Sequence, residues 1–201
     1  MRNKIIKNAA ILTGITLIAG LLLGAVQGIT EKPIANAQEK AKQEAYKQVF
    51  SSADSFEDYE GFDEKEAAET VKNIEGTIIN EAVVAKESGK ETGYVITATD
   101  KNGYGGDIQV SVGIKNDGTV NGIAILKINE TAGLGMKAQE PEFYNQFRDK
   151  KVENFEVTKS GASTDNQIDA LSGATITSNA VTGAVNAALT YYQTIGGGGN
   201  E

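Results

Sequence analysis

The chain has 201 residues and a formal net charge of −8, which is enough for one compact domain with a hydrophobic core plus shorter appendages. It contains no Cys and no His, which excludes disulfides, thiolate nucleophiles, iron–sulfur ligation and imidazole-based metal or acid–base sites. Any redox chemistry must therefore use a borrowed cofactor. The acidic balance argues against nucleic acid as a partner.

The N-terminal segment is the clearest feature of the sequence. No charged residue occurs from Asn8 to Thr30, and a helix of that length crosses a bilayer core of about 30 Å. A positive flank is typical of the cytoplasmic side of a membrane, and the basic residues ahead of the segment are Arg2, Lys4 and Lys7. We therefore expect a cytoplasmic tail over residues 1–7 and a single-pass transmembrane helix in the lipid bilayer over residues 8–30. The rest of the chain is expected on the outer (extracellular or periplasmic) face of the cell membrane.

A cleaved signal peptide is the main alternative for this segment, and a buried core helix is a second one, which the asymmetry of the flanking charges disfavours. Residues 35–37, Ala-Asn-Ala, have the small-x-small form of a cleavage site. However, the uncharged segment is longer than the core of about 7–15 residues that signal peptides use, and the candidate site lies well beyond it. These two features favour an uncleaved anchor.

Residues 31–74 are expected to form a juxtamembrane helix and an acidic linker. Residues 35–50 are rich in strong helix formers, whereas residues 51–64 are acidic and turn-rich, as in a loop. A short helix is predicted over residues 65–73.

Strand-like alternation dominates the next part of the chain, so we expect one exported domain over residues 75–195. Four strands are predicted, over residues 77–86, 92–99, 107–115 and 119–129. Asn116-Asp117-Gly118 predicts a tight hairpin turn between the last two of them. Helices are predicted over residues 141–149, with Pro141 in the first turn, and over residues 176–194. The expected fold is α+β, with a mostly antiparallel sheet and flanking helices, followed by a flexible tail over residues 196–201.

Small hydroxyl residues crowd around Gly173, where the last helix is expected to begin. Ser172 and Thr175 flank Gly173 and Ala174, and Thr177 and Ser178 follow. A helix start offers unpaired N–H groups and a partial positive charge, which together suit a phosphate. No Lys or Arg follows Gly161, so backbone amides would have to hold such an anion. The same residue types are preferred helix N-caps, so a purely structural cap is the alternative.

The segment from Asp169 to Ser178, Asp-Ala-Leu-Ser-Gly-Ala-Thr-Ile-Thr-Ser, resembles the flavinylation motif of the FMN-binding domain family. This family includes G subunits of Rnf-type ion-translocating electron transport complexes and C subunits of sodium-translocating NADH:quinone oxidoreductases. Two further blocks, residues 103–114 and 129–135, are similar to the family's ordered series, and the resemblance covers residues 75–192. The second block departs from the family pattern at Ala132, where relatives usually have Pro, and the chain lacks the His often found shortly before it.

The resemblance implies a covalent cofactor and names the residues that hold it. FMN would be joined through a phosphoester to Thr175 by a dedicated flavin transferase, and the motif residues around it are Asp169, Ser172, Gly173 and Ala174. A loop over residues 130–135 would lie against the isoalloxazine ring.

Within that loop, the resemblance makes Thr131 a hydrogen-bond partner and Leu134 an apolar contact, with Glu130 and Gly135 at its ends. Tyr104 would line the same cleft. Each assignment has a structural alternative: Leu134 as a core residue, Tyr104 as a strand-edge aromatic, and a Glu130 carboxylate that accepts from backbone amides of the turn. The glycines at 105 and 106 could form a β-bulge.

The implied function is that of an electron-transfer flavoprotein subunit of an Rnf-type membrane complex, which couples ferredoxin/NAD electron transfer to ion translocation. Its partners would be the other subunits of the complex. The chain has no nicotinamide motif and no iron–sulfur ligands, so it is not expected to be catalytic alone, and no metal site is predicted. The alternatives are a C-type subunit of a sodium-pumping NADH:quinone oxidoreductase, a free-standing membrane-anchored extracellular flavoprotein, and a sensor module.

Overall fold

A single long helix, α1 (Arg2–Val49), begins the computed structural model, which describes residues 2–196. The chain divides into two compact units, residues 1–42 and residues 43–201. Most of the tail expected over residues 196–201, and the first residue of the expected cytoplasmic tail, lie outside the described residues.

The part of α1 in the first unit is apolar and exposed. Its large hydrophobic side chains, from Ile5 to Ile34, lie on the surface, and the helix is long and apolar enough to cross a membrane. Surface of this kind is stable only in another apolar environment, and a lipid bilayer provides one. The helix therefore has the character of a membrane anchor.

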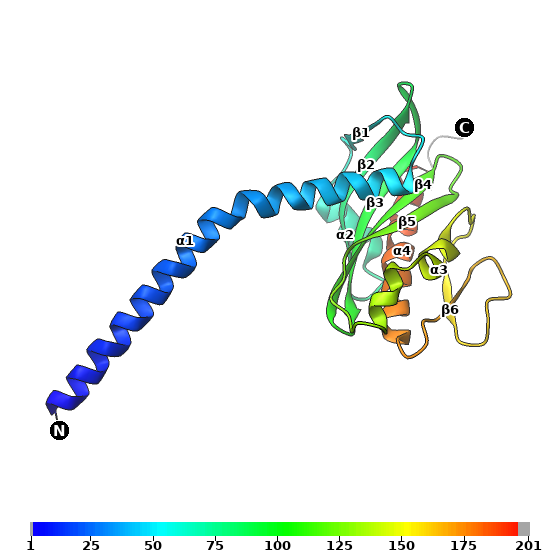
Figure 1. Ribbon diagram of the computed structural model, residues 1–201. Coiled ribbons are helices and arrows are strands. Elements are labelled where there is room, and N and C mark those ends of the chain that lie inside the picture. The colour runs from blue at the N-terminus through cyan, green and yellow to red at the C-terminus, as the bar shows by residue number, and fades with distance from the viewer. Residues whose placement is uncertain (1, 197–201) are drawn as a thin grey trace. The chain divides into compact units, whose positions relative to one another are not determined.

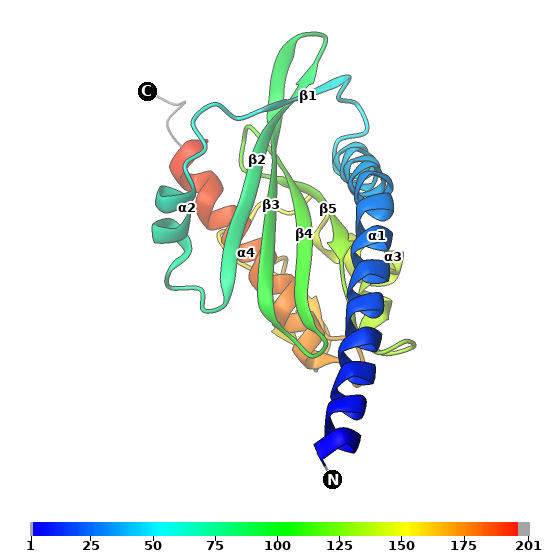
Figure 2. The same cartoon turned by 90° about the vertical axis from the view of Figure 1, so that its left-hand side faces the viewer.

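The second unit is built on a five-stranded antiparallel sheet whose strands are hydrogen-bonded in chain order. The strands are β1 (Ser55–Asp58), β2 (Thr77–Glu87), β3 (Lys90–Gly103), β4 (Gly106–Lys115) and β5 (Val120–Lys127). Figures 1 and 2 show β2 to β4 as the long central ribbons. The expected α+β fold with a mostly antiparallel sheet is confirmed.

The main core lies between one face of this sheet and two helices, α4 (Thr175–Ile195) and α2 (Glu64–Val71). Successive side chains of a strand point to opposite faces. In β3, Tyr94, Ile96 and Ala98 accordingly join this core, whereas Val95 lies on the other face. In Figure 2, α4 crosses behind the central strands, and the helix starts toward one end of the sheet.

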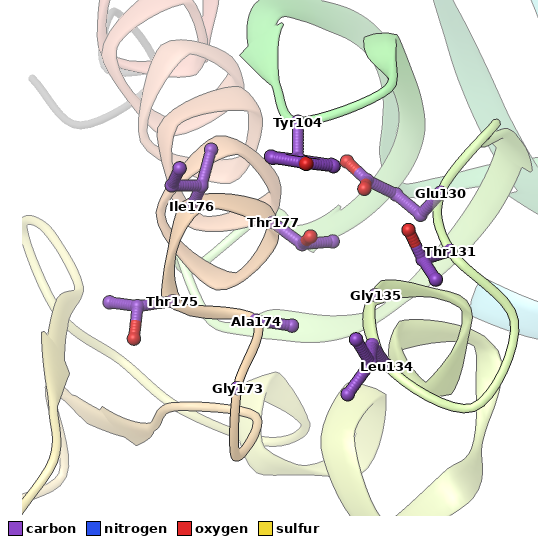
Figure 3. A pocket seen from close by; sticks show the side chains of 10 residues that line it. All are labelled: Tyr104, Glu130, Thr131, Leu134, Gly135, Gly173, Ala174, Thr175, Ile176 and Thr177. Atoms are coloured by element: carbon purple, nitrogen blue, oxygen red, sulfur yellow. The ribbon is translucent and has the colours of Figure 1, made fainter.

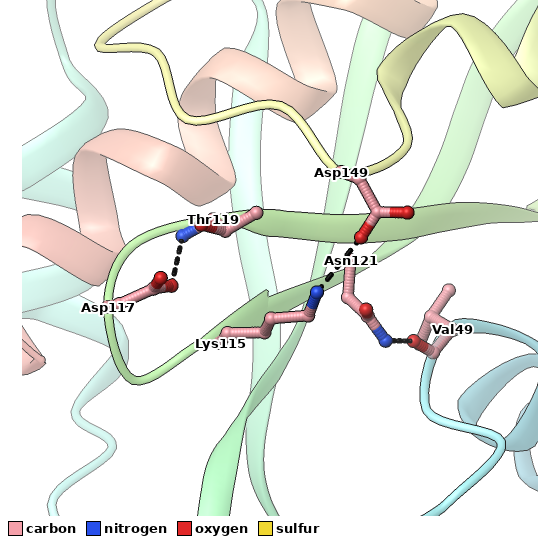
Figure 4. A network of polar contacts seen from close by, with 6 residues as sticks. All are labelled: Val49, Lys115, Asp117, Thr119, Asn121 and Asp149. Atoms are coloured by element: carbon pink, nitrogen blue, oxygen red, sulfur yellow. Dashed lines mark hydrogen bonds and ion pairs between the residues drawn. The ribbon is translucent and has the colours of Figure 1, made fainter.

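The last turns of α1, which belong to the second unit, cover the other face. Tyr46 and Val49 are buried there, and the Tyr46 hydroxyl donates a 2.7 Å hydrogen bond to Glu81 Oε1. The side-chain amide of Asn121 in β5 donates to the Val49 carbonyl oxygen, as Figure 4 shows. A β-carbon at Gly113 would lie 2.8 Å from Val49 Cβ, so the glycine permits this close approach. The end of α1 is thus part of the folded domain.

The hairpin predicted at Asn116-Asp117-Gly118 is confirmed. Gly118 has a φ of +84°, and its N–H donates to the Lys115 carbonyl oxygen at 2.9 Å. Asp117 Oδ1 accepts from the Thr119 N–H at 2.9 Å (Figure 4), and this bond holds the pKa of the Asp117 carboxyl below its ordinary value.

Two of the expected elements are wrong in part. Residues 51–64 are not all loop, because they contain strand β1, which pairs with β2. The acidic residues of β1 lie at a sheet edge, where charge is tolerated. Because of its acidic composition, this strand was predicted as a loop. The helix expected over residues 141–149 is instead a short α-helix, α3 (Pro141–Tyr144), continued by a 3₁₀ turn, η2 (Asn145–Phe147).

Three short elements were not predicted from the sequence. They are a 3₁₀ turn, η1 (Gly135–Gln139), and two strands, β6 (Glu156–Thr158) and β7 (Gln167–Asp169), which pair in parallel. A strand of three residues is too short to show alternation.

Candidate functional site

A pocket of about 620 Å³ lies at the start of α4, bounded by three segments that are far apart in the sequence. They are the β3–β4 turn, the loop that leads into η1, and the loop that leads into α4. Figure 3 shows the residues that line the pocket, which are Tyr104, Glu130, Thr131, Leu134, Gly135, Gly173, Ala174, Thr175, Ile176 and Thr177.

The loop into α4 is held by Ser178. The Ser178 hydroxyl oxygen accepts from the Leu171 N–H at 2.9 Å and donates to the Ala174 carbonyl oxygen at 3.0 Å. Gly173, with a φ of +73°, supplies the left-handed residue that the turn needs. This arrangement fixes the chain just before the helix starts.

The helix start itself is not capped by the hydroxyl cluster. The N-cap residue is Ala174, which has no side-chain oxygen, and the first backbone bond of the helix runs from the Ser178 N–H to the Ala174 carbonyl. Among the described residues, no acceptor pairs with the N–H groups of Thr175, Ile176 or Thr177. The cluster therefore leaves the amides at this helix end available, contrary to the cap alternative.

The loop over residues 130–135 forms the opposite wall. The Thr131 carbonyl oxygen accepts from the N–H groups of Leu134 at 3.1 Å and Met136 at 3.2 Å, which closes the loop as a tight turn. A β-carbon at Gly135 would lie 2.6 Å from the Thr177 hydroxyl oxygen. The glycine thus allows the loop to pack directly on the first turn of α4.

Tyr104 stands at the tip of the β3–β4 hairpin, in the turn between Gly103 and Gly106. A β-carbon at Gly105 would lie 1.8 Å from the Asn129 carbonyl oxygen, so only glycine fits beside the second loop. The bulge suggested at residues 105 and 106 is instead a register shift earlier in β3, between Asp100 and Gly103.

Apolar side chains around the pocket remain exposed. The exposed fractions are 73% for Tyr104, 52% for Ile176 and 43% for Leu134. One large exposed hydrophobic residue is ordinary, but three around one pocket leave an apolar surface for a ligand to cover.

Glu130 is the only carboxylate in the lining, and neither Lys nor Arg lines this pocket. Its Oε1 atom is buried and has no hydrogen-bond donor among the described residues. We suggested that the Glu130 carboxylate accepts hydrogen bonds from backbone amides of the turn, and for its Oε1 atom this is wrong.

All the residues that the sequence named for the site line the pocket except Ser172 and Asp169. Ser172 is exposed in the loop before α4. Asp169 Oδ1 accepts from the Ala162 N–H at 2.6 Å, and Asp169 lines a separate polar depression beside the Lys150–Asp165 ion pair. Residues 2–196 contain no group of three or more His, Cys, Asp or Glu side chains that could hold a metal ion.

Two residues of the pocket lining, Ile176 and Thr177, were not predicted from the sequence. Both lie in the first turn of α4, and Ile176 exposes an apolar side chain. The available signal was a large aliphatic residue directly after a cluster of small hydroxyl residues.

The chain carries an FMN-binding domain that follows its N-terminal apolar helix in sequence. A family model described as the FMN-binding domain matches residues 103–190, and one described as the RnfG N-terminal region matches residues 1–49.

Two full-length relatives are similar to the whole chain. The chain is 32% identical over 95% of its length, and 93% of the relative's, to the G subunit of the Na(+)-translocating ferredoxin:NAD(+) oxidoreductase complex of Acetobacterium woodii. It is 34% identical over 98% of its length, and 96% of the relative's, to the G subunit of the proton-translocating ferredoxin:NAD(+) oxidoreductase complex of Clostridium ljungdahlii. The chain belongs to the G-subunit (RnfG) family of ion-translocating oxidoreductase complexes.

A solved structure supports the fold. The C subunit of the Na(+)-translocating NADH-quinone reductase from Parabacteroides distasonis superposes with a TM-score of 0.50 at 27% identity. The match covers 59% of this chain and 63% of that chain, less than two thirds of the neighbour's length.

Proposed function

We propose that this chain is the G subunit of a membrane-bound complex that couples electron transfer between ferredoxin and NAD to ion translocation. It relays electrons through FMN bound covalently to Thr175. The observation that carries the proposal is the convergence at one pocket of three segments, around Tyr104, Glu130 and Thr175. All three fall inside the FMN-binding domain match.

The pocket suits FMN in size and in the distribution of its chemistry. Its volume of about 620 Å³ is in the range of cofactor sites. The exposed side chains of Tyr104, Leu134 and Ile176 offer apolar surface to a ring system. At the other end, the N–H groups at the start of α4 can hold a phosphate without a basic side chain.

Among the hydroxyl residues in the first turn of α4, Thr175 is the one open to modification. It is the first residue of α4 and is partly exposed, whereas Thr177 and Ser178 are buried. Its side chain stands at the edge of the pocket, away from Glu130 and Tyr104 (Figure 3). Among the described residues its hydroxyl has no hydrogen-bond partner. Attachment would join Thr175 Oγ1 to the phosphorus of the FMN half of FAD, and AMP would leave.

The residues of the chain then bind and orient the cofactor, which when bound supplies the one- and two-electron chemistry. The start of α4 holds the phosphate and fixes one end of the molecule. Leu134 and Ile176 pack on the ring and exclude water from part of it. α1 anchors the domain in the membrane, with the FMN domain on the outer face, so that the flavin stays beside its partner subunits.

A C-type subunit of a sodium-pumping quinone reductase fits the structural neighbour but fits the whole chain less well. The match to that neighbour spans 63% of its length, whereas the G-subunit relatives match over 93% and 96% of theirs. The N-terminal match to the RnfG region points the same way.

The test is electron transfer by the whole complex in membranes. Thr175→Ala should abolish ferredoxin-dependent reduction of NAD while the complex still assembles. Thr164→Ala, a change at an exposed threonine outside the pocket, should retain the activity. Wild-type rates in assembled Thr175→Ala complexes would overturn the proposal.

A further inference from the structure

One carboxylate oxygen of Glu130, Oε1, is buried without a hydrogen-bond partner among the described residues. A buried, unpaired carboxylate oxygen is costly, so such groups persist where a ligand or a proton completes them. The rest of the side chain lies in the pocket lining.

The two neighbouring glycines make room for this carboxylate. A β-carbon at Gly103 would lie 3.0 Å from Glu130 Oε1, and a β-carbon at Gly135 would lie 2.9 Å from Oε2. Any larger residue at either position would push the carboxylate out of its place. The carboxyl group is therefore held between the two loops and, in Figure 3, points across the pocket toward Tyr104.

The charge of Glu130 is not compensated within the pocket. The lining contains no Lys or Arg, and the other polar side chains are hydroxyls. A ring bound here would meet one negatively charged side chain and no positively charged one. In a partly buried site such a charge acts strongly on its neighbours, because water screens it poorly.

Resting on the proposed function, we propose that Glu130 orients the flavin ring and lowers its reduction potential. The unpaired Oε1 accepts a hydrogen bond from a ring N–H, and the carboxylate charge disfavours the added electron. Glu130 thus acts on the flavin directly, and a flavin of lower potential passes its electron on more readily to the next acceptor.

The test is a potentiometric titration of the flavin in the purified, flavin-loaded full-length protein at one fixed pH, followed by absorbance. Glu130→Gln keeps the side-chain shape and removes the charge, and Glu130→Asp keeps the charge. Glu142→Gln removes one exposed carboxylate of α3, outside the pocket, and is the matched control.

We expect Glu130→Gln to shift the equilibrium toward the reduced flavin by tenfold or more, which is about 59 mV for a one-electron couple. Glu130→Asp should move it less, and Glu142→Gln should leave it unchanged. A potential in Glu130→Gln equal to that of the wild type would overturn the inference, as would an equal shift in Glu142→Gln.

The same samples separate this inference from the proposed function. A wild-type protein that carries no flavin after maturation contradicts the proposed function itself. Flavin present in every variant with unchanged potentials contradicts only the role of Glu130. Glu130→Ala serves as a second uncharged variant if Glu130→Gln does not fold, and thermal melting identifies that case.

Discussion

The Cδ2 atom of Leu134 lies 3.3 Å from the place that a β-carbon on Gly173 would occupy. This contact brings the loop before η1 against the loop before α4, although the two residues are far apart in the sequence. Both residues line the pocket (Figure 3).

Gly173→Ala should therefore disturb both the backbone and this contact. The φ of +73° costs an alanine about 1–2 kcal/mol, and the new methyl group would press on Leu134. Gly133→Ala is the matched control, because its φ is +77° and a β-carbon there would meet nothing within 4 Å. Urea unfolding should show similar losses of stability, but only Gly173→Ala should also reduce flavin content. Equal flavin content in the two variants would contradict the contact's role.

Ser178→Ala should loosen the loop that precedes α4. The change removes the acceptor for the Leu171 N–H, and leaving such a group unpaired costs about 1–3 kcal/mol. Ser172→Ala, at an exposed hydroxyl in the same loop, should stay within about 0.5 kcal/mol of the wild type. Chemical unfolding at neutral pH measures both, and a Ser178→Ala protein as stable as Ser172→Ala would count against the account.

Asp100 should make stability fall as the pH rises. The residue is 4% exposed on β3, and a β-carbon at Gly183 of α4 would lie 2.2 Å from its Oδ2 atom. Burial raises the pKa of the Asp100 carboxyl, and the hydrogen bond from the Asn102 N–H offsets only part of this. The folded protein thus holds the proton more tightly than the unfolded chain does.

The stability that this proton contributes is fully present below the unfolded pKa of about 3.9 and is lost as the pH rises through the folded pKa. Asp100→Asn cannot ionise, so its free energy of unfolding relative to the wild type should increase across that window and then level off. Urea titrations at a series of pH values measure the difference. A constant difference between the two proteins would show that Asp100 does not titrate in this way.

The folded domain should begin near Gln43 rather than at residue 75. A chain that starts at Gln43 keeps Tyr46 and Val49 on the sheet, whereas one that starts at Glu75 also loses β1 and α2 and exposes Val95. The first should unfold cooperatively in urea, and the second should be less stable or aggregate. Equal unfolding midpoints would refute this boundary.

The sequence predicted the parts of the fold in which hydrophobic periodicity is strong. The four long strands and the Asp117-Gly118 turn follow from local alternation and turn chemistry. The edge strand β1 could not be predicted in this way. Its pairing with β2 depends on a partner about 30 residues away in the sequence and not on its own composition. The end of α1 is helical by composition, but nothing local reveals that it covers a sheet face.

In the site too, sequence motifs predicted some features, whereas others depend on contacts between distant segments. Glu130 and Thr175 were named through the resemblance of their motifs, and the fold places both in one pocket. The unpaired state of Glu130 Oε1 could not be foreseen, because it depends on the donors that surround it in space. Asp169 lies near Thr175 in sequence, yet β7 carries it to a different surface depression.

The covalent link to Thr175 is the central claim, and flavin fluorescence in a denaturing gel, paired with intact mass, tests it most directly. The proteins are the wild type, Thr175→Ala and Thr177→Ala, each produced together with a flavin transferase. We expect a fluorescent band with the added mass of FMN in the wild type and in Thr177→Ala, and neither signal in Thr175→Ala. A dark wild-type band, or a label that persists in Thr175→Ala, would contradict it.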